Sequence, residues 1–321
     1  MQEGQEYFTE AFNWIKENGA WDRSFIEQFD EKFPQLKDNR IVQHLIGYWF
    51  EGINGEKHLS SPIKTHAFGT HEDENNEVVL GPVSKIIDMI GEGQEVRFNL
   101  RVKEVDYSGD KVTVTCAEGQ VFQADRVILT VPHGVLKKGD INFIPQLPPA
   151  KRDAIENTQN LALDLFYLVF DRVFWVDNQQ FNYIGGNSKK FGWFFNYNYI
   201  NPESFTLRTE ANGPYALELE LQSDEEVLEE IMANLRDIYG PDIPYPIHFH
   251  RSKWMTNPNT CFIGTFAGLK SKPEDIDVLA ESVDGKLFFA GDYTSADDQG
   301  YMGGAYDSGI REASKIISLA N

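Results

Sequence analysis

Hydrophobic positions in the first fifty residues recur with the period of an α-helix. Between residues 8 and 16, apolar side chains are separated by acidic residues and a lysine, the pattern of a helix that buries one face. Gly19 and Pro34 interrupt this pattern, so we expect three amphipathic helices with breaks near these two residues. Residues 55–76 are polar and predict a loop.

Beyond this loop the pattern becomes a mixture of helix and strand. Residues 83–90 have helical spacing, whereas residues 96–105 and 111–116 alternate as strands do. Gly119 marks a hairpin turn before a short strand at residues 121–122. This part of the chain therefore predicts α/β structure.

The middle of the chain predicts a sheet with a covering helix. Residues 163–170 and 215–221 have the composition of strands. Ser223 and Glu226 have the spacing of a capping box, a run with helical spacing follows, and Gly240 ends it. We expect this helix to be structural, because no side chain on it suggests chemistry.

The chain is strongly acidic. It has 29 Lys and Arg against 50 Asp and Glu, a formal net charge of −21 at pH 7. Such a surface repels nucleic acid and anionic lipid, and attracts cationic ligands such as polyamines. The acids are spread along the chain, which fits equally the simpler role of keeping the protein soluble. Neither a nucleic-acid partner nor a membrane partner is expected.

Cysteine and histidine usage excludes two further kinds of site. Cys116 and Cys261 cannot form a disulfide framework, which indicates a reducing, intracellular and cytoplasmic setting. No apolar run has the length of a membrane span, and no signal peptide opens the sequence. His248 and His250 share one strand face, but no third ligand accompanies them at metal spacing, so no metal site is expected.

The last thirty-seven residues contain the clearest functional pattern. An apolar strand at residues 285–290 ends at Gly291, Asp292 follows directly, and the segment 300–305 (GYMGGA) opens a helix-like run. A carboxylate accepts hydrogen bonds from a ribityl chain, glycines let backbone approach a planar ring, and a helix N-terminus favours the electron-rich edge of a flavin. On the pattern alone, an ordinary strand–turn–helix is an equal alternative.

This segment resembles the C-terminal flavin motif of the FAD-dependent amine oxidases, which include polyamine oxidases, monoamine oxidases and flavin histone demethylases. Further segments resemble the family in the same order. These are residues 125–136, which resemble the family's "aD.VivTvPlgvLk", residues 141–148 and 170–175, and the stretch from residue 223 to Pro258. Together the matches extend from about residue 76 to residue 321.

The resemblance implies a mixed α/β (α+β) fold with two interleaved domains and an active site where they meet. It divides the chain into a helical part of the substrate domain (1–76), a FAD-domain segment (77–135), the substrate-domain sheet and helices (136–250) and the C-terminal FAD-domain segment (251–321). The family's dinucleotide-binding βαβ unit is absent from the expected fold, because the sequence contains no Gly-x-Gly-x-x-Gly. We expect that a partner chain supplies this unit, or that the sequence is a truncated portion of a longer protein.

The resemblance also implies site residues. Tyr301 and Phe262 would be aromatic walls that orient an amine, and the backbone N–H of Met302 would bind flavin O2. Leu165 stands where the family usually has a lysine, and Asp292 where it usually has a glutamate. The residues expected to contact the cofactor are Val102, at its adenine end, and Trp254, Gly291, Asp292, Tyr301, Met302 and Ala305.

Two functions remain open from the sequence. The first is FAD-dependent oxidation of an amine, such as a polyamine, to an imine with oxygen as acceptor; the flavin carries the electrons. The second is an inactive amine-oxidase-like structural or assembly subunit, suggested by Leu165 and the missing glycine fingerprint. An amino-acid or alkene substrate ranks below both, because no carboxylate-binding arginine is identified.

FAD is expected to bind non-covalently. Cys261 and Phe262 resemble the pair through which monoamine oxidases attach flavin, but a cysteine in an apolar stretch is more often a small core residue. The lone chain is expected to bind FAD weakly or not at all, because contacts to the diphosphate are missing.

Overall fold

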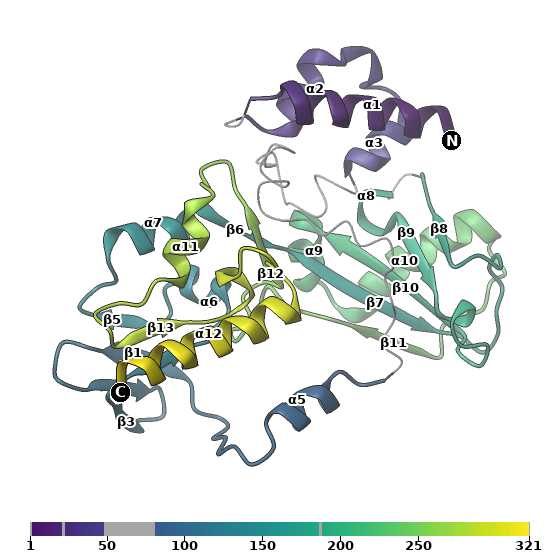
Figure 1. The fold of residues 1–321 in the computed structure, drawn as a ribbon. Coiled ribbons are helices and arrows are strands. Elements are labelled where there is room, and N and C mark those ends of the chain that lie inside the picture. The colour runs from purple at the N-terminus through teal and green to yellow at the C-terminus, as the bar shows by residue number, and fades with distance from the viewer. Residues whose placement is uncertain (1, 21–22, 48–80, 186–187, 321) are drawn as a thin grey trace.

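The computed structural model describes residues 2–20, 23–47, 81–185 and 188–320. These residues form three groups of elements (Figure 1): an N-terminal helical cluster, a unit that ends in the long helix α12, and a unit built on a five-stranded sheet. We call the last two the α12 unit and the sheet unit. The loop expected at residues 55–76 lies outside the described residues.

The N-terminal cluster is helical, as the spacing of apolar residues predicts. It contains α1 (Gln2–Asn18), α2 (Phe25–Lys32), η1 (Pro34–Leu36) and α3 (Arg40–Ile46). α1 ends before Gly19, where a Cβ atom would collide with the carbonyl oxygen of Ile15. The core of this cluster is rich in aromatic side chains, including Phe25, Phe29 and Phe33.

The α12 unit combines the middle of the chain with its end. A four-stranded sheet has the order β3 (Val121–Ala124), β2 (Val112–Cys116), β1 (Val102–Asp106) and β5 (Asn142–Ile144), and a parallel pair joins β4 (Val127–Leu129) to β13 (Leu287–Phe289). Leu129 and Leu136 share one core with Leu287 and Phe289. The helices of this unit are α6 (His133–Lys138), α7 (Pro149–Asn157), α11 (Glu274–Ala280) and α12 (Met302–Ala320).

The strand expected at residues 96–105 is only half right. β1 begins at Val102, opposite Cys116 of β2, and the residues before it have no neighbouring strand. Val96 and Phe98 are 56% and 78% exposed. Their alternating pattern makes no strand because nothing pairs with it. The helix expected at residues 83–90 is present as α5 (Ser84–Ile90), and none of its residues is buried.

The sheet unit holds five strands in the order β11 (His248–Arg251), β7 (Leu163–Val169), β10 (Thr206–Asn212), β9 (Trp193–Asn196) and β8 (Gln180–Asn182), all paired antiparallel. α8 (Ser188–Phe191) and η3 (Tyr197–Tyr199) are short connecting elements. α10 (Asp224–Tyr239) buries Val227 and Ile231 against Phe166 of β7. As predicted, it begins at a capping box of Ser223 and Glu226 and ends at Gly240.

The strand expected at residues 215–221 is wrong. This segment is the helix α9 (Gly213–Glu220), which has Pro214 in its first turn. The residues Tyr-Ala-Leu-Glu-Leu-Glu-Leu alternate in polarity, but they also place Ala216, Leu219 and Glu220 on one buried helical face. Pro214 has a φ compatible with the first turn of a helix, and burial of this face against β7 and β10 decides between the two periods.

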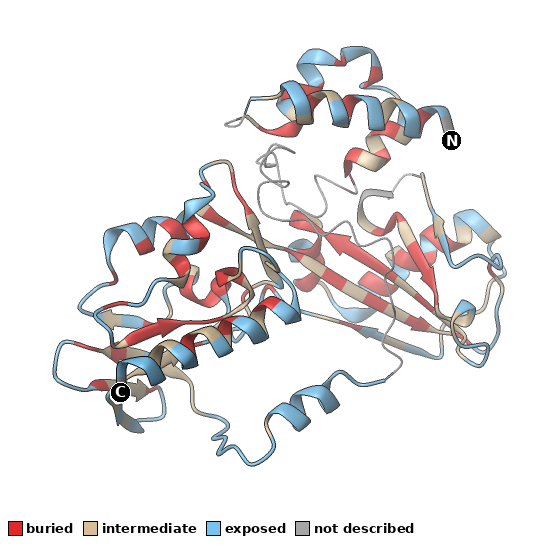
Figure 2. Ribbon diagram, viewed as in Figure 1, coloured by how far each residue is buried: buried red, intermediate tan, exposed pale blue. Residues whose placement is uncertain are grey.

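Two paired strands connect the units. β6 (Thr158–Leu161) leads through Ala162 into β7, and β12 (Gly264–Ala267) pairs antiparallel with β6 on the way back. Buried residues of both units lie on either side of this ribbon (Figure 2). The space beside β6 and β12 is therefore bordered by two cores.

Candidate active site

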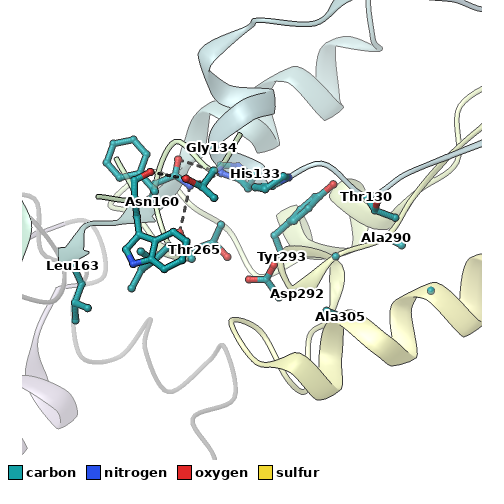
Figure 3. A pocket seen from close by; sticks show the side chains of 18 of the residues that line it. Thr130, His133, Gly134, Asn160, Leu163, Thr265, Ala290, Asp292, Tyr293 and Ala305 are labelled. Carbon is teal, nitrogen blue, oxygen red and sulfur yellow. Dashed lines mark hydrogen bonds between the residues drawn. The ribbon is translucent and has the colours of Figure 1, made fainter. Parts of the chain in front are cut away.

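A cavity of about 510 Å³ lies where the β6–β12 ribbon meets both units. Its volume is within the range of small-molecule sites, roughly 300–1,000 Å³. Four separate parts of the chain form its wall (Figure 3). The lining residues are Thr130, Pro132, His133, Gly134, Asn160, Leu163, Leu165, Trp254, Thr260, Phe262, Ile263, Gly264, Thr265, Ala290, Gly291, Asp292, Tyr293, Ala305 and Gly309.

β13 carries an acid directly into this cavity. Gly291 has φ +148°, and a Cβ atom there would lie 2.6 Å from the ring of Tyr293, so the corner requires glycine. Asp292 begins the short helix η4 (Asp292–Thr294), and burial raises the pKa of its carboxyl group. The corner thus places a hydrogen-bond acceptor in a largely apolar space beside Ala305.

The opposite wall is aromatic. The carbonyl oxygen of Trp254 accepts hydrogen bonds from Thr260 Oγ1 at 2.6 Å and from the N–H of Phe262 at 3.2 Å, so a tight turn holds both rings at the cavity. Cys261 and Phe262 have φ of +52° and +134°, which side-chain-bearing residues rarely adopt. Such backbone strain often occurs at functional sites.

A buried histidine borders the cavity from the start of α6. His133 is 3% exposed, its Nδ1 lies 3.1 Å from Asn160 Nδ2 and 3.3 Å from Asn160 Oδ1, and its ring centroid is 5.7 Å from that of Tyr293. Burial, assisted by the nearby charge of Lys137, lowers the pKa of His133 to about 4. Burial also raises the pKa of the Tyr293 hydroxyl. Both side chains are therefore neutral near pH 7.

Comparison with protein families gives a match over nearly the whole chain. Residues 15–317 match the family described as flavin containing amine oxidoreductase. The chain belongs to the flavin-containing amine oxidoreductase family. The resemblance stated from the sequence motifs, and the mixed helix-and-sheet fold that it implies, are thereby confirmed.

Proteins similar to this chain include a polyamine oxidase and a histone demethylase. Polyamine oxidase 4 of Oryza sativa subsp. japonica is 32% identical over 294 residues, covering 88% of this chain and 58% of the relative. Lysine-specific histone demethylase 1B of Mus musculus is 28% identical over 303 residues, covering 92% of this chain and 37% of the relative. The chain thus spans from about a third to somewhat more than half of these proteins.

A solved structure shares the amine oxidoreductase fold. A putrescine oxidase variant with redesigned cofactor binding superimposes with a TM-score of 0.74 at 19% identity, covering 99% of this chain and 75% of that chain. This likeness supports the fold. The family match does not include a dinucleotide-binding βαβ unit at its start, since it begins at residue 15 within α1.

The cavity unites most of the residues that the sequence singled out. Leu165, Trp254, Phe262, Gly291, Asp292 and Ala305 all line it. The residues present fit the isoalloxazine and ribityl parts of a flavin: small residues, a partly buried acceptor and aromatic rings around one cavity.

The remaining predicted residues lie elsewhere. Tyr301 and Met302, at the start of α12, are 58% and 55% exposed and do not line the cavity. Val102 lines a separate cavity of about 190 Å³. Cys261 lines a third cavity, which shares Phe262 with the first. Their roles in an amine oxidoreductase stay predictions.

His133, Asn160, Tyr293 and Thr130 line the cavity but were not singled out in the sequence. For His133 a signal existed, because it stands at a position that is apolar in the family pattern. Within the described residues, no three His, Cys, Asp or Glu side chains gather to hold a metal ion, and no helix combines the length and apolar character needed to cross a lipid bilayer.

Proposed function

We propose that this chain takes part in the FAD-dependent oxidation of an amine, and that the 510 Å³ cavity holds the reactive part of the flavin. The observation that carries the proposal is the convergence on one cavity of Asp292, the small residues around it and two aromatic rings. Membership of the amine oxidoreductase family supplies the flavin. When bound, the flavin accepts the electrons released at the amine carbon and passes them to oxygen.

Asp292 is the proposed anchor for the ribityl hydroxyls. Its carboxyl group is an acceptor in an apolar setting, where a hydrogen bond is stronger than in water. Gly291, Ala305 and Gly309 leave room for close approach of the ring. We propose non-covalent binding, because Cys261 lies outside this cavity.

Trp254 and Phe262 are the proposed walls that orient the amine. Leu165 faces the same space and cannot hold a proton or a water molecule as a lysine does, so the substrate amine must arrive neutral. Tyr301 and Met302, at the N-terminus of α12, are kept as proposed contacts to the flavin edge, where the helix dipole favours negative charge. Val102 is the proposed contact at the adenine end.

The proposed substrate is a small amine, with polyamines favoured. A relative is a polyamine oxidase, and a structural neighbour is a putrescine oxidase. The net charge of −21 attracts polycations and disfavours nucleic acid or anionic membranes as partners. Cys116 and Cys261 are both free and buried, which fits the proposed cytoplasmic location.

The alternative is an inactive assembly subunit that works with a partner chain. α12 exposes an apolar stripe formed by Met302, Tyr306, Ile310 and Ile317, each between 50% and 63% exposed. α5 adds Ile87 and Met89, at 57% and 76%. We propose that a dinucleotide-binding fold, supplied by a partner chain or by a further segment of a longer protein, covers these surfaces. If the chain is an oxidoreductase, full FAD affinity would then need both parts, whereas an inactive assembly subunit would stay flavin-free in its complex.

The test is titration of the purified chain with FAD, followed by fluorescence and by anaerobic bleaching of flavin absorbance with putrescine or spermidine. We expect weak binding by the lone chain. Asp292→Ala should weaken it a further ten- to hundredfold, since a hydrogen bond to a charged group contributes about 1.5–3 kcal/mol. Asp297→Ala, an exposed acid nearby, is the matched control. Equal affinity in both variants, or no binding and no bleaching even with a dinucleotide-binding partner, would contradict the proposal.

A further inference from the structure

Two buried carboxyl groups meet on the far side of β7 from the cavity. Asp164 is 1% exposed, and Glu220, the last residue of α9, is 6% exposed. Side chains alternate along a strand, so Leu163 and Leu165 face the cavity while Asp164 faces away from it. The two carboxyl groups are neighbours, close enough to form a hydrogen bond when one of them carries a proton.

Both carboxyl groups bind the backbone that carries the aromatic wall. Asp164 Oδ1 accepts hydrogen bonds from Ser252 Oγ at 2.8 Å and from the N–H of Trp254 at 3.4 Å. The two oxygens of Glu220 accept from the N–H groups of Met255 and Thr256 at 2.8 and 2.7 Å. The pair therefore accepts hydrogen bonds from three consecutive backbone N–H groups, those of residues 254–256. Ser252 Oγ also accepts from the N–H of Leu165, at 2.9 Å.

A hydrogen bond between two carboxyl groups needs one proton, because two carboxylates offer only acceptors. Burial, followed by the negative charge of Glu220, raises the pKa of Asp164 to about 7. Arg251, the last residue of β11, is already engaged: it donates to the carbonyl oxygens of Leu219 and Gln222 and to Asp224. The paired strand β10 presents Ala211 opposite Asp164.

We propose that Asp164 and Glu220 share one proton and act together as a positioning pair for Trp254 and Phe262. The pair hydrogen-bonds the backbone of residues 254–256. The carbonyl oxygen of Trp254 then accepts the hydrogen bonds that fix the turn containing Phe262. Loss of the shared proton leaves two buried carboxylates in contact. Their repulsion separates α9 from β7 and loosens the aromatic wall of the cavity.

The direction of the pH effect follows from the shared proton. The folded chain keeps the Asp164 proton to a higher pH than the unfolded chain, so the stability that it contributes is complete below about pH 4 and is lost as the pH rises through about 7. The aromatic wall should be ordered below this pH and loosened above it.

The experiment needs no flavin and uses the whole chain. Infrared spectroscopy across a pH titration should show a protonated-carboxyl C=O band that disappears as the pH rises and that is missing in Asp164→Asn. Amide hydrogen exchange at Met255 and Thr256, corrected for its intrinsic pH dependence, should quicken about tenfold or more from about pH 6 to about pH 9. In Asp164→Asn the exchange should not change with pH, because the amide donates permanently to Glu220.

Glu220→Gln is the second variant and should also abolish the pH dependence, since it removes the other carboxyl group. Glu218→Gln is the matched control on the same helix, where the exposed carboxyl group accepts from Lys190; it should behave as the wild type. The proposal fails if the wild type lacks the band, if Asp164→Asn retains the pH-dependent exchange, or if Glu218→Gln abolishes it. The bearing of the pair on amine oxidation rests on the proposed function, whereas these readouts do not.

Discussion

Gly134 packs directly against the carbonyl oxygen of Cys261, so closely that a Cβ atom at position 134 would overlap it. This contact joins the first turn of α6 to the turn in which Cys261 and Phe262 have positive φ. A strained backbone conformation of this kind costs about 1–3 kcal/mol. It persists only where the surrounding packing enforces it, as the contact with Gly134 does here. The contact thus supports the aromatic wall at Cys261, apart from residues 254–256 where the Asp164–Glu220 pair binds it.

Gly134→Ala should lower the free energy of unfolding by about 1–3 kcal/mol, the usual cost of overpacking. It should also weaken flavin binding, because Phe262 must move. Urea unfolding and FAD titration check the two effects. Gly109→Ala is the control: its nearest neighbour to an added Cβ atom is 3.8 Å away, and its effect should stay within about 0.5 kcal/mol. Equal stability of the two variants would contradict the role given to Gly134.

His133→Leu should make the protein more resistant to acid. The pKa of His133 is about 4 when folded, below about 6.5 when unfolded, so the unfolded state takes up the proton first as the pH falls through this window. The wild type therefore loses stability there, and the leucine variant lacks this loss. Melting temperatures of both proteins at about pH 5 and about pH 8 measure the difference. His248→Leu, at an exposed position, should leave the pH dependence unchanged. If His133→Leu is as sensitive to acid as the wild type, the prediction is wrong.

Leu165→Lys separates the two functional hypotheses. The register partner of Leu165 on β10 is the buried Glu210, and a cross-strand pair of opposite charges is favourable, so we expect the variant to fold. An active amine oxidoreductase should keep or gain oxygen consumption with a polyamine when FAD is present. An inactive subunit should show no turnover even then. Leu165→Met controls for the change in side-chain volume.

Lys151→Met should destabilise the α12 unit by about 1–3 kcal/mol for each carbonyl group left without a partner. Lys151 is 2% exposed, and its Nζ donates to the carbonyl oxygens of Val278 and Leu279 at 2.7 and 3.0 Å, near the end of α11. It also lies 3.9 Å from the centre of the Phe289 ring. Thermal unfolding measures the stability of this variant. Lys103→Met, at an exposed position on β1, is the control and should hardly change the stability.

Elements with local start and stop signals could be predicted from the sequence. α10 has its capping box and its terminal glycine within one short stretch, and Asp292 follows its strand directly. α9 could not be predicted, because its alternating residues suit either period and its burial against β7 and β10 decides. The strand before Val102 failed because strand formation depends on a neighbour, which no local pattern reveals.

The cavity could be predicted only in part, for the same reason. Asp292 and Gly291 belong to one motif, whereas His133 and Tyr293 are separated by about half of the chain and meet only through tertiary packing. Likewise Asp164 and Glu220 lie in two segments that the sequence predicts as strands, residues 163–170 and 215–221. Their meeting depends on α9 lying beside β7, which follows from the helix that the sequence did not predict.

The ribbon of β6 and β12 has a mechanical consequence. Antiparallel strands held by hydrogen bonds resist stretching, but a two-stranded ribbon twists easily. Because β6 and β12 are paired strands between the α12 unit and the sheet unit, we expect relative movement of the two units to occur as twisting of this ribbon. Asn160 and Thr265, which sit on its two strands, lie near the axis, whereas Asp292 and Leu165 are carried by different units. We therefore expect entry into the cavity to depend on how readily the ribbon of β6 and β12 twists.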